Sequence, residues 1–446
     1  MAKELDLLEV CGGQRPVGRV RVSGAKNSAI KLLAAALLTE ETVHLMNFPT
    51  QLVDVRQKVS FLEALGVSVE LCPEKSLVSL TPSGLCRERL DHYNYSFRTT
   101  YLLVPGQLIR SGIARIPYPG GCKIGERKYD LHVMVWEQMG CVVTEREDHI
   151  EVRCPKLKPA CIDFPISTVG GTETALLCGA VAEGETVIKN AYVTPEIMNL
   201  VDMLRGMGAQ VEVVGNSLIR VVGRGALHGV SIPVIPDRIE ALTWIVYSIL
   251  AKGNVVIEDV PFDAMDVPLI HLKEAGIDLF RNTQDVYVGP TCFRREGIQP
   301  FELACGTHPG VISDMQPFFV LLGMFADGRS RIIDYRYPER VAYLAELNKL
   351  CGGKIRAERG EIVIEGPVRV AGAEVVSTDL RGSMALVLAG LLGEGKSRIH
   401  GVSMALRGYN DLLGKLAGLG VEARMVTEDL PLPVGAETAA GVAPQP

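Results

Sequence analysis

A helix–glycine–strand pattern recurs six times along the chain and constrains its fold more than any other feature. In each copy, an apolar helical stretch leads through a short polar turn into a β-rich run. A second amphipathic helix then ends at a glycine before another strand. These glycines are Gly66, Gly140, Gly208, Gly276, Gly352 and Gly420. A glycine just past a helix commonly adopts the left-handed conformation that closes the last turn, so the recurrence has a backbone reason. The period of roughly 70 residues exceeds that of solenoid repeats and suits a βαβαββ-type unit.

The length of the chain indicates how these units are grouped. Its 446 residues are too many for one small core and suggest two domains. The natural break lies at 223–236, where glycine and proline are dense and a short loop leads into Asp237. The sequence therefore predicts an α/β fold of two domains with three repeats in each.

Composition excludes several classes of protein. Apolar residues at 47 % and charged residues at 22 % are typical of a soluble globular chain. The net charge of −6 argues against a general partner for nucleic acid or for an anionic membrane. The 11 cysteines are scattered without a CxxC pair, which favours free thiols over a disulfide framework or a zinc site.

Location is predicted from what the sequence lacks. The first residues carry charges where a signal peptide would be apolar. No apolar run approaches the roughly 18 residues of a membrane span, and Lys31 interrupts the nearest candidate at 29–38. We therefore expect a cytoplasmic protein. Residues 431–446, rich in proline, glycine and alanine, are expected to be disordered.

A cysteine lies in a glycine-rich segment at 119–127. Cys122 stands between a Gly-Gly pair and Gly125, with Lys123 and Arg127 nearby. Glycines favour a loop over a core segment, and neighbouring cations lower the pKa of a thiol. This segment is either a reactive loop or a surface loop with an incidental cysteine. Taken alone, its residues leave both interpretations open.

Polar and basic residues gather where the first helix of each unit should begin. The clusters lie at 23–27, 98–100, 167–172, 236–238, 313–316 and 378–381. Helix N-termini attract anions, although a serine, threonine or aspartate there usually caps the helix. Lys26, Arg98 and Arg381 at such ends oppose the helix dipole, so we expect their partner to be an anionic ligand shared between helices. Together with Arg127, Arg340 and Arg407 they predict a cationic cleft for phosphate and carboxylate groups.

On these motifs, from about residue 7 to 426, the chain resembles the enolpyruvyl transferases, in particular the branch that acts on UDP-N-acetylglucosamine in peptidoglycan synthesis. The segments that carry the resemblance are 23–27, 119–127, 130–132, 236–240, 314–316, 378–381 and 407–409. The shikimate-phosphate enzymes of the same fold lack the cysteine loop.

The resemblance implies a two-domain inside-out α/β barrel with a cleft between the domains. The first domain would span residues 24–235 and carry the Cys122 loop as a lid. Residues 1–23 would complete the second domain together with residues 236–430.

The resemblance also implies an addition–elimination reaction between phosphoenolpyruvate and a sugar hydroxyl. Cys122 would be the acid and Asp314 the base, with Lys26 and Arg407 also catalytic. Lys26, Arg127 and Arg407 would hold the phosphate, Arg340 and Arg407 the carboxylate, and Asn27 and Asp314 the amino sugar. Asp130, Leu131 and the Thr168, Val169 and Gly170 backbone would hold the uridine diphosphate. The remaining expected substrate contacts are Arg98, Asp237, Arg336, Asp379 and Arg381. No metal, organic cofactor or obligate protein partner is implied.

Several positions depart from the family pattern, and most of them lie where the acceptor should bind. They are Val53, Leu102, Glu126, Lys128, Tyr129, Ile166, Arg336 and Leu406. Lys128 and Arg336 add cations there. Two alternatives therefore stay open beside UDP-N-acetylglucosamine: the same chemistry on another nucleotide such as UMP, or a paralogue that binds a UDP-sugar without turnover.

Overall fold

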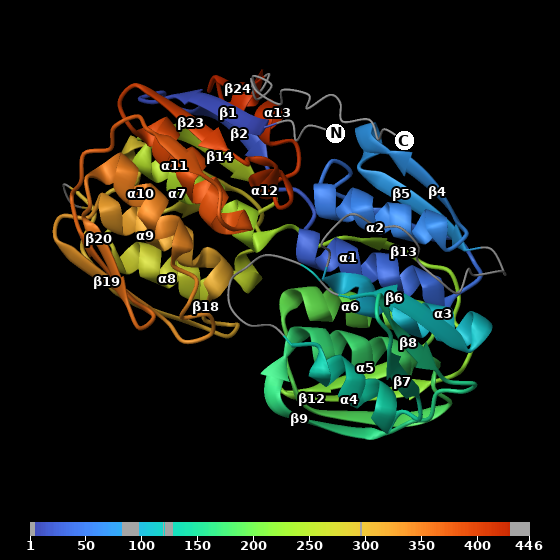
Figure 1. The fold of residues 1–446 in the computed structure, drawn as a ribbon. Helices are drawn as coiled ribbons and strands as arrows, with labels where there is room; N and C mark the ends of the chain where they lie inside the picture. Colours follow the sequence, from blue (N-terminus) through green and yellow to red (C-terminus); the bar gives the residue numbers. More distant parts are fainter. Residues whose placement is uncertain (1–4, 83–97, 119, 121–127, 295–296, 429–446) are drawn as a thin grey trace, which may run out of the picture.

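The computed structural model describes residues 5–82, 98–118, 120, 128–294 and 297–428, and the structural statements below concern these residues. Their buried apolar side chains form two large clusters. One cluster, which defines the first body, draws its side chains from residues 29–234. The other, which defines the second body, draws them from residues 8–22 and 239–421. Figure 1 shows the first body from blue to green, and the second from yellow to red together with the blue N-terminal strands.

Three sheets belong to the first body, in the orders β13–β3–β5–β4, β6–β8–β7 and β11–β12–β10–β9. Its strands are β3 (Val43–Met46), β4 (Val67–Cys72), β5 (Leu77–Pro82), β6 (Ile113–Pro117), β7 (Val142–Glu145), β8 (His149–Arg153), β9 (Cys161–Thr168), β10 (Gly184–Ala191), β11 (Gln210–Val214), β12 (Leu218–Gly223) and β13 (Ser231–Pro233). Its helices are α1 (Lys26–Ala35), η1 (Ala36–Leu38), α2 (Val53–Ala64), η2 (Pro73–Lys75), η3 (Thr99–Leu103), α3 (Val104–Ser111), α4 (Asp130–Gln138), α5 (Val169–Val181) and α6 (Pro195–Gly206).

Three further sheets belong to the second body, in the orders β22–β23–β1–β24, β15–β16–β14–β2 and β18–β17–β19–β21–β20. Its strands are β1 (Leu5–Cys11), β2 (Val17–Arg21), β14 (Asn254–Glu258), β15 (Phe280–Arg281), β16 (Val286–Val288), β17 (Glu302–Gly306), β18 (Val311–Ile312), β19 (Arg329–Asp334), β20 (Ile355–Glu358), β21 (Glu361–Glu365), β22 (Glu374–Val376), β23 (Lys396–His400) and β24 (Ala423–Glu428). Its helices are α7 (Arg238–Leu250), η4 (Phe262–Ala264), α8 (Asp266–Glu274), η5 (Pro290–Cys292), η6 (Ser313–Met315), α9 (Gln316–Met324), α10 (Ala342–Cys351), α11 (Leu380–Leu392), α12 (Ser403–Leu406) and α13 (Leu412–Gly418).

The third unit shows the repeat in full. β9 and β10 are parallel and joined through α5, while β12 and β11 follow α6 and add antiparallel strands. Other units borrow a strand from a distant part of the chain. β2 pairs in parallel with β14, β1 lies between β23 and β24, and β13 returns to pair with β3. The N-terminal strands thus belong to sheets of the second body.

Helices fill the interior of both bodies and the sheets cover them. Every residue of α7 and of α9 is buried, as is almost every residue of α5 and α11. A helix that is apolar on all sides has no face for water, so it must lie inside. The predicted inside-out α/β fold is confirmed, and the described strands form six separate sheets with no closed barrel.

The helix-ending glycines behave as predicted. Gly66, Gly140, Gly208, Gly276, Gly352 and Gly420 all have positive φ, between 70° and 103°. A side chain in that region would be strained, which explains why the same residue type closes the second helix of each unit.

The structure bears on the prediction about membrane spans but not on the prediction of a disordered tail. Within the described part of the chain, no helix is both long and apolar enough to cross a membrane. The predicted tail at 431–446 lies outside the described residues.

Candidate functional site

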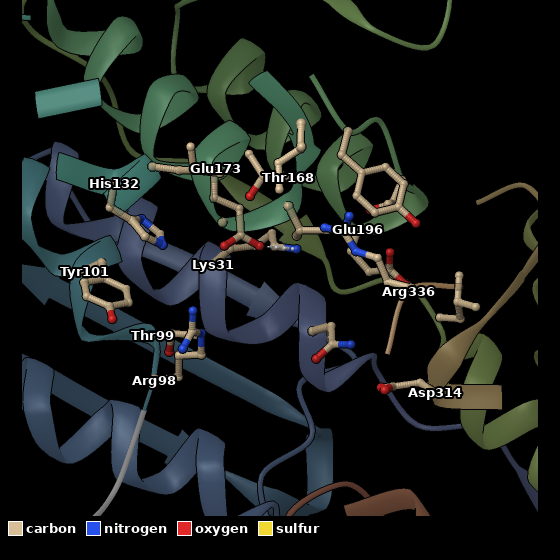
Figure 2. Close-up of a pocket in the computed structure, with 18 of the residues that line it drawn as sticks. Lys31, Arg98, Thr99, Tyr101, His132, Thr168, Glu173, Glu196, Asp314 and Arg336 are labelled. Carbon is tan, nitrogen blue, oxygen red and sulfur yellow. Dashed lines mark ion pairs between the residues drawn. The ribbon is translucent and has the colours of Figure 1, made fainter. Parts of the chain in front are cut away.

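A cavity of about 660 Å³ lies between the two bodies and draws its lining from both. It brings together nine of the predicted site residues: Asn27, Arg98, Asp130, Leu131, Thr168, Val169, Gly170, Asp314 and Arg336. Figure 2 shows His132 and Tyr101 at one end of the cavity and Asp314 at the other. Cys122 and Arg127 lie outside the described residues, so their predicted roles stay predictions.

The other predicted residues do not line the cavity. Lys26, Asp237, Arg340, Asp379, Arg381 and Arg407 form ion pairs beside it instead. Most of these charges are buried, so each needs an opposite charge or a hydrogen bond within the protein. Among the predicted residues, Asp314 both lines the cavity and forms an ion pair with buried arginines beside it.

Asp314 lies on the short helix η6 and faces two buried arginines. Its Oδ1 is 2.7 Å from Nη1 of Arg340, and its Oδ2 is 3.6 Å from Nε of Arg381. The carboxylate keeps 31 % of its surface exposed, whereas the two arginine side chains are 3 % and 1 % exposed. Desolvation alone would raise the pKa of Asp314, but Arg340 and Arg381 outweigh it and hold that pKa well below its usual range. Asp314 is therefore an anion at neutral pH.

A second carboxylate pairs with two of the cations that were predicted to hold phosphate. Asp54, on α2, is 2.9 Å from Nζ of Lys26 and 2.7 Å from Nε of Arg407. Lys26 belongs to the first body and Arg407 to the second, so Asp54 ties the two bodies together. Burial would raise the pKa of Asp54, yet the two cations lower it.

Two of the cations expected to share an anionic ligand already face carboxylates of the protein. Lys26 lies beside Asp54, and Arg381 lies beside Asp237 and Asp314. A buried cation without a partner is costly, and these aspartates remove that cost before any ligand arrives.

Three of the expected helix caps are present. Oγ1 of Thr168 accepts the Gly171 N–H at the start of α5, and Asp237 and Asp379 accept two N–H groups each at the starts of α7 and α11. The first-turn residues Val169 and Gly170 line the cavity, where the first N–H groups of a helix have no partner within it. Arg98 precedes the 3-10 helix η3, and its Nη2 donates to the Lys128 carbonyl at 2.8 Å.

His132 is a fixed neutral group at the far end of the cavity. Its ring stacks on Tyr101 with centroids 4.2 Å apart, and Nδ1 lies 2.7 Å from Oγ1 of Thr174. A Cβ on Gly170 would come within 2.8 Å of its Nε2, so the helix start needs glycine here. Burial, with a smaller effect of Arg98, lowers the pKa of His132 to about 3. His132 therefore lines the cavity as a neutral ring at neutral pH.

Two buried ion pairs in the lining were not predicted from the sequence. Lys31 and Glu173 meet at 2.8 Å, and Figure 2 shows them in the middle of the lining. Arg238 donates from Nε to Glu196 at 2.9 Å, which joins α7 of the second body to α6 of the first. The available signal was a charge inside an apolar helical run, as at Lys31 in 29–38.

The positions that depart from the family pattern fall into two groups. Leu102, Lys128, Ile166 and Arg336 line the cavity, while Val53, Tyr129 and Leu406 do not. The Tyr129 hydroxyl donates to Glu145 at 2.5 Å, away from the lining. Four of the eight altered positions therefore line the cavity, and Glu126 lies outside the described residues.

Within the described ranges, no group of three or more histidine, cysteine, aspartate or glutamate residues is placed to hold a metal ion. The cavity offers a carboxylate, several guanidinium groups and the N-terminus of a helix, which suit an anionic organic substrate.

The amino-acid sequence is similar to those of known proteins. Residues 10–416 match the family described as EPSP synthase (3-phosphoshikimate 1-carboxyvinyltransferase). The chain is 36 % identical over 418 residues to UDP-N-acetylglucosamine 1-carboxyvinyltransferase 2 of Carboxydothermus hydrogenoformans, covering 94 % of this chain and 98 % of that one. It is also 36 % identical over 421 residues to UDP-N-acetylglucosamine 1-carboxyvinyltransferase of Acidiphilium cryptum, covering 94 % and 99 %.

Solved structures give the same picture of the fold. The enolpyruvyl transferase NikO from Streptomyces tendae superposes with a TM-score of 0.85 at 26 % identity, covering 96 % of this chain and 100 % of that one. EPSP synthase from Acinetobacter baumannii superposes with a TM-score of 0.71 at 20 % identity, covering 95 % and 100 %, which bears on the fold alone.

Proposed function

From the premise that the chain belongs to the EPSP synthase family of 1-carboxyvinyltransferases, we propose that it transfers the enolpyruvyl group of phosphoenolpyruvate to the 3-hydroxyl of UDP-N-acetylglucosamine. The relatives that match nearly the whole chain carry the name of that activity. The reaction releases phosphate and needs no redox step.

The observation that carries the proposal is the position of Asp314. Its carboxylate lies in the cavity lining and, on the other side, contacts the buried guanidinium groups of Arg340 and Arg381. A base for the acceptor hydroxyl is thus next to cations for an anionic cosubstrate. That juxtaposition is what an attack of a hydroxyl on phosphoenolpyruvate requires.

The reaction proceeds by addition and then elimination. The acceptor oxygen forms a bond to C2 of phosphoenolpyruvate, its proton passes to Asp314, and C3 receives a proton from the acid, for which the sequence offers Cys122. In the second step, C3 loses a proton and the bond between C2 and the phosphate oxygen breaks. The products are the enolpyruvyl ether and inorganic phosphate, so atoms and electrons balance.

Phosphoenolpyruvate brings two anionic groups to cations that already face carboxylates. We assign its phosphate to Lys26, Arg407 and Arg127, and its carboxylate to Arg340 together with Arg407. A contact of Arg340 with this carboxylate weakens its ion pair with Asp314. The pKa of Asp314 then rises toward its usual range, because one of the cations that lowered it is shared. Asp314 becomes a stronger base once the cosubstrate is bound.

The acceptor occupies the remainder of the cavity. Asn27 and Asp314 bind the amino sugar, while the start of α5, with Asp130 and Leu131, binds the nucleotide. Lys31 and Arg238 contribute little charge to it, because Glu173 and Glu196 neutralise them.

A second candidate keeps the chemistry and changes the acceptor to another uridine nucleotide such as UMP. Two observations favour it: Lys128 and Arg336 add charge to the acceptor half of the cavity, and NikO, which is named as an enolpyruvyl transferase without that acceptor, superposes closely.

Phosphate release from phosphoenolpyruvate tests both candidates. We expect release with UDP-N-acetylglucosamine and none without an acceptor. Release with UMP but not with UDP-N-acetylglucosamine would favour the second candidate, and no release with any nucleotide would refute both and favour a binding paralogue. Asp314→Asn should lower the rate of release at least about 100-fold, whereas Asp163→Asn, on an exposed position of β9, should not.

A further inference from the structure

Arg336 lines the cavity and has no carboxylate partner among the described residues. Its Nη2 donates to the Ser167 carbonyl at 3.1 Å, a contact between the second body and the first. Lys31 and Arg238 in the same lining face carboxylates at 2.8 and 2.9 Å. The Arg336 guanidinium makes no ion pair with any described residue, and it donates to the neutral backbone oxygen of Ser167. Unlike Lys31 and Arg238, it can therefore exchange a neutral partner for an anion.

A buried carboxylate fixes the backbone at Arg336. Oδ1 of Asp334 accepts the backbone N–H groups of Arg336 at 2.9 Å and Tyr337 at 2.8 Å. The other oxygen, Oδ2, accepts from the Ser313 hydroxyl and from Nε2 of Gln316. Ser313 precedes the proposed base Asp314 in η6. One carboxylate, 2 % exposed, thus fixes the guanidinium and the base relative to each other.

We propose that Arg336 binds a phosphate group of the acceptor and so selects phosphorylated nucleotides over neutral ones. This inference rests on the proposed function and specifies the acceptor class for the same cavity. On binding, the guanidinium leaves the Ser167 carbonyl and donates to phosphate oxygens, because a charge-assisted hydrogen bond is stronger than one to a neutral oxygen. Asp334 is the positioning residue that holds Arg336 at a set distance from Asp314.

The surroundings of the guanidinium favour phosphate over a hydroxyl group. Ser167, its present partner, immediately precedes Thr168, which caps α5. The first turn of α5 adds partial positive charge at the same place. Arg336 lines the cavity, whereas Lys26, Arg340 and Arg407, which are assigned to phosphoenolpyruvate, do not.

Binding of UDP and of uridine to the same variants tests the proposal. UDP carries the phosphates and uridine lacks them, so the comparison isolates the contact with phosphate. Arg336→Gln removes the charge, Arg336→Lys keeps it without the planar fork, and Arg331→Gln is a control on β19 whose side chain pairs with Glu361 at the surface. Calorimetry gives the dissociation constants, and circular dichroism checks that each variant folds.

We expect Arg336→Gln to weaken UDP binding about ten-fold or more and to change uridine binding less than two-fold. Arg336→Lys should recover part of the loss, and Arg331→Gln should match the wild type. Equal weakening of UDP and uridine would overturn the proposal, because Arg336 would then serve only to bridge the two bodies. Unchanged UDP binding in Arg336→Gln would overturn it as well. The proposed function fails separately, if the wild-type chain releases no phosphate from phosphoenolpyruvate with any nucleotide.

Discussion

Replacement of Glu196 by glutamine tests how the two bodies are held together. Glu196, on α6, contacts Arg238, on α7, through two hydrogen bonds of 2.9 and 3.3 Å, and both side chains are at least nine-tenths buried. Burial alone would raise the pKa of Glu196, but Arg238 and Lys31 lower it from 4.5 to about 2. That difference corresponds to about 3 kcal/mol of folding free energy, since one pKa unit is about 1.4 kcal/mol.

The sign of the pH dependence follows from the direction of the shift. A carboxylate whose pKa is lowered by folding contributes its full stabilisation above its unfolded pKa of 4.5, and loses it as the pH falls toward 2. Glu196→Gln should therefore lower the free energy of unfolding by about 3 to 5 kcal/mol at pH 7, because it also leaves Arg238 buried without a carboxylate. The deficit should be about 1 kcal/mol smaller at pH 3.5.

Urea unfolding measures this deficit in the two bodies together. Fluorescence reports on Trp136 in the first body and Trp244 in the second. Glu183→Gln, on an exposed pair with Lys156, is the matched control and should change stability by less than about 1 kcal/mol. A Glu196→Gln deficit below 1 kcal/mol at pH 7, or one that grows as the pH falls, would refute the reasoning.

Three further predictions concern the reaction. Asp314→Asn should lower kcat at least about 100-fold in a phosphate-release assay, with Asp163→Asn near the wild type; equal rates would exclude Asp314 as the base. Arg407→Gln should raise the KM for phosphoenolpyruvate about ten-fold or more while the acceptor KM changes less than two-fold, and a larger effect on the acceptor would contradict the assignment. Intact mass after treatment with a fosfomycin-type epoxide should show one adduct that disappears in Cys122→Ala; an adduct that persists there would identify another thiol as the reactive one.

The fold was largely predictable because its signals are local. A glycine that closes a helix acts within one turn, so the six glycines indicated the repeat without knowledge of tertiary contacts. Thr168, Asp237 and Asp379 cap helices for the same reason, and their positions could be identified in advance.

The charge pairs of the site were less predictable because they join distant segments. Lys31 meets Glu173, and Glu196 meets Arg238, only because interior helices pack against each other. The sequence showed a lysine inside an apolar run but not its partner. Asp334 gave still less signal, since its role depends on a turn and on η6 meeting at one carboxylate. The aspartate partners of Lys26 and Arg381 were not predicted for the same reason.

The most direct test of the account follows the fate of the acceptor in deuterated water. After incubation with phosphoenolpyruvate and UDP-N-acetylglucosamine, mass spectrometry and proton NMR should show an enolpyruvyl-modified sugar nucleotide in the same amount as free phosphate. Its C3 methylene should carry deuterium, because addition and elimination pass a solvent-exchangeable proton through that carbon. Phosphate released without a modified nucleotide, or a product free of deuterium at C3, would contradict the account.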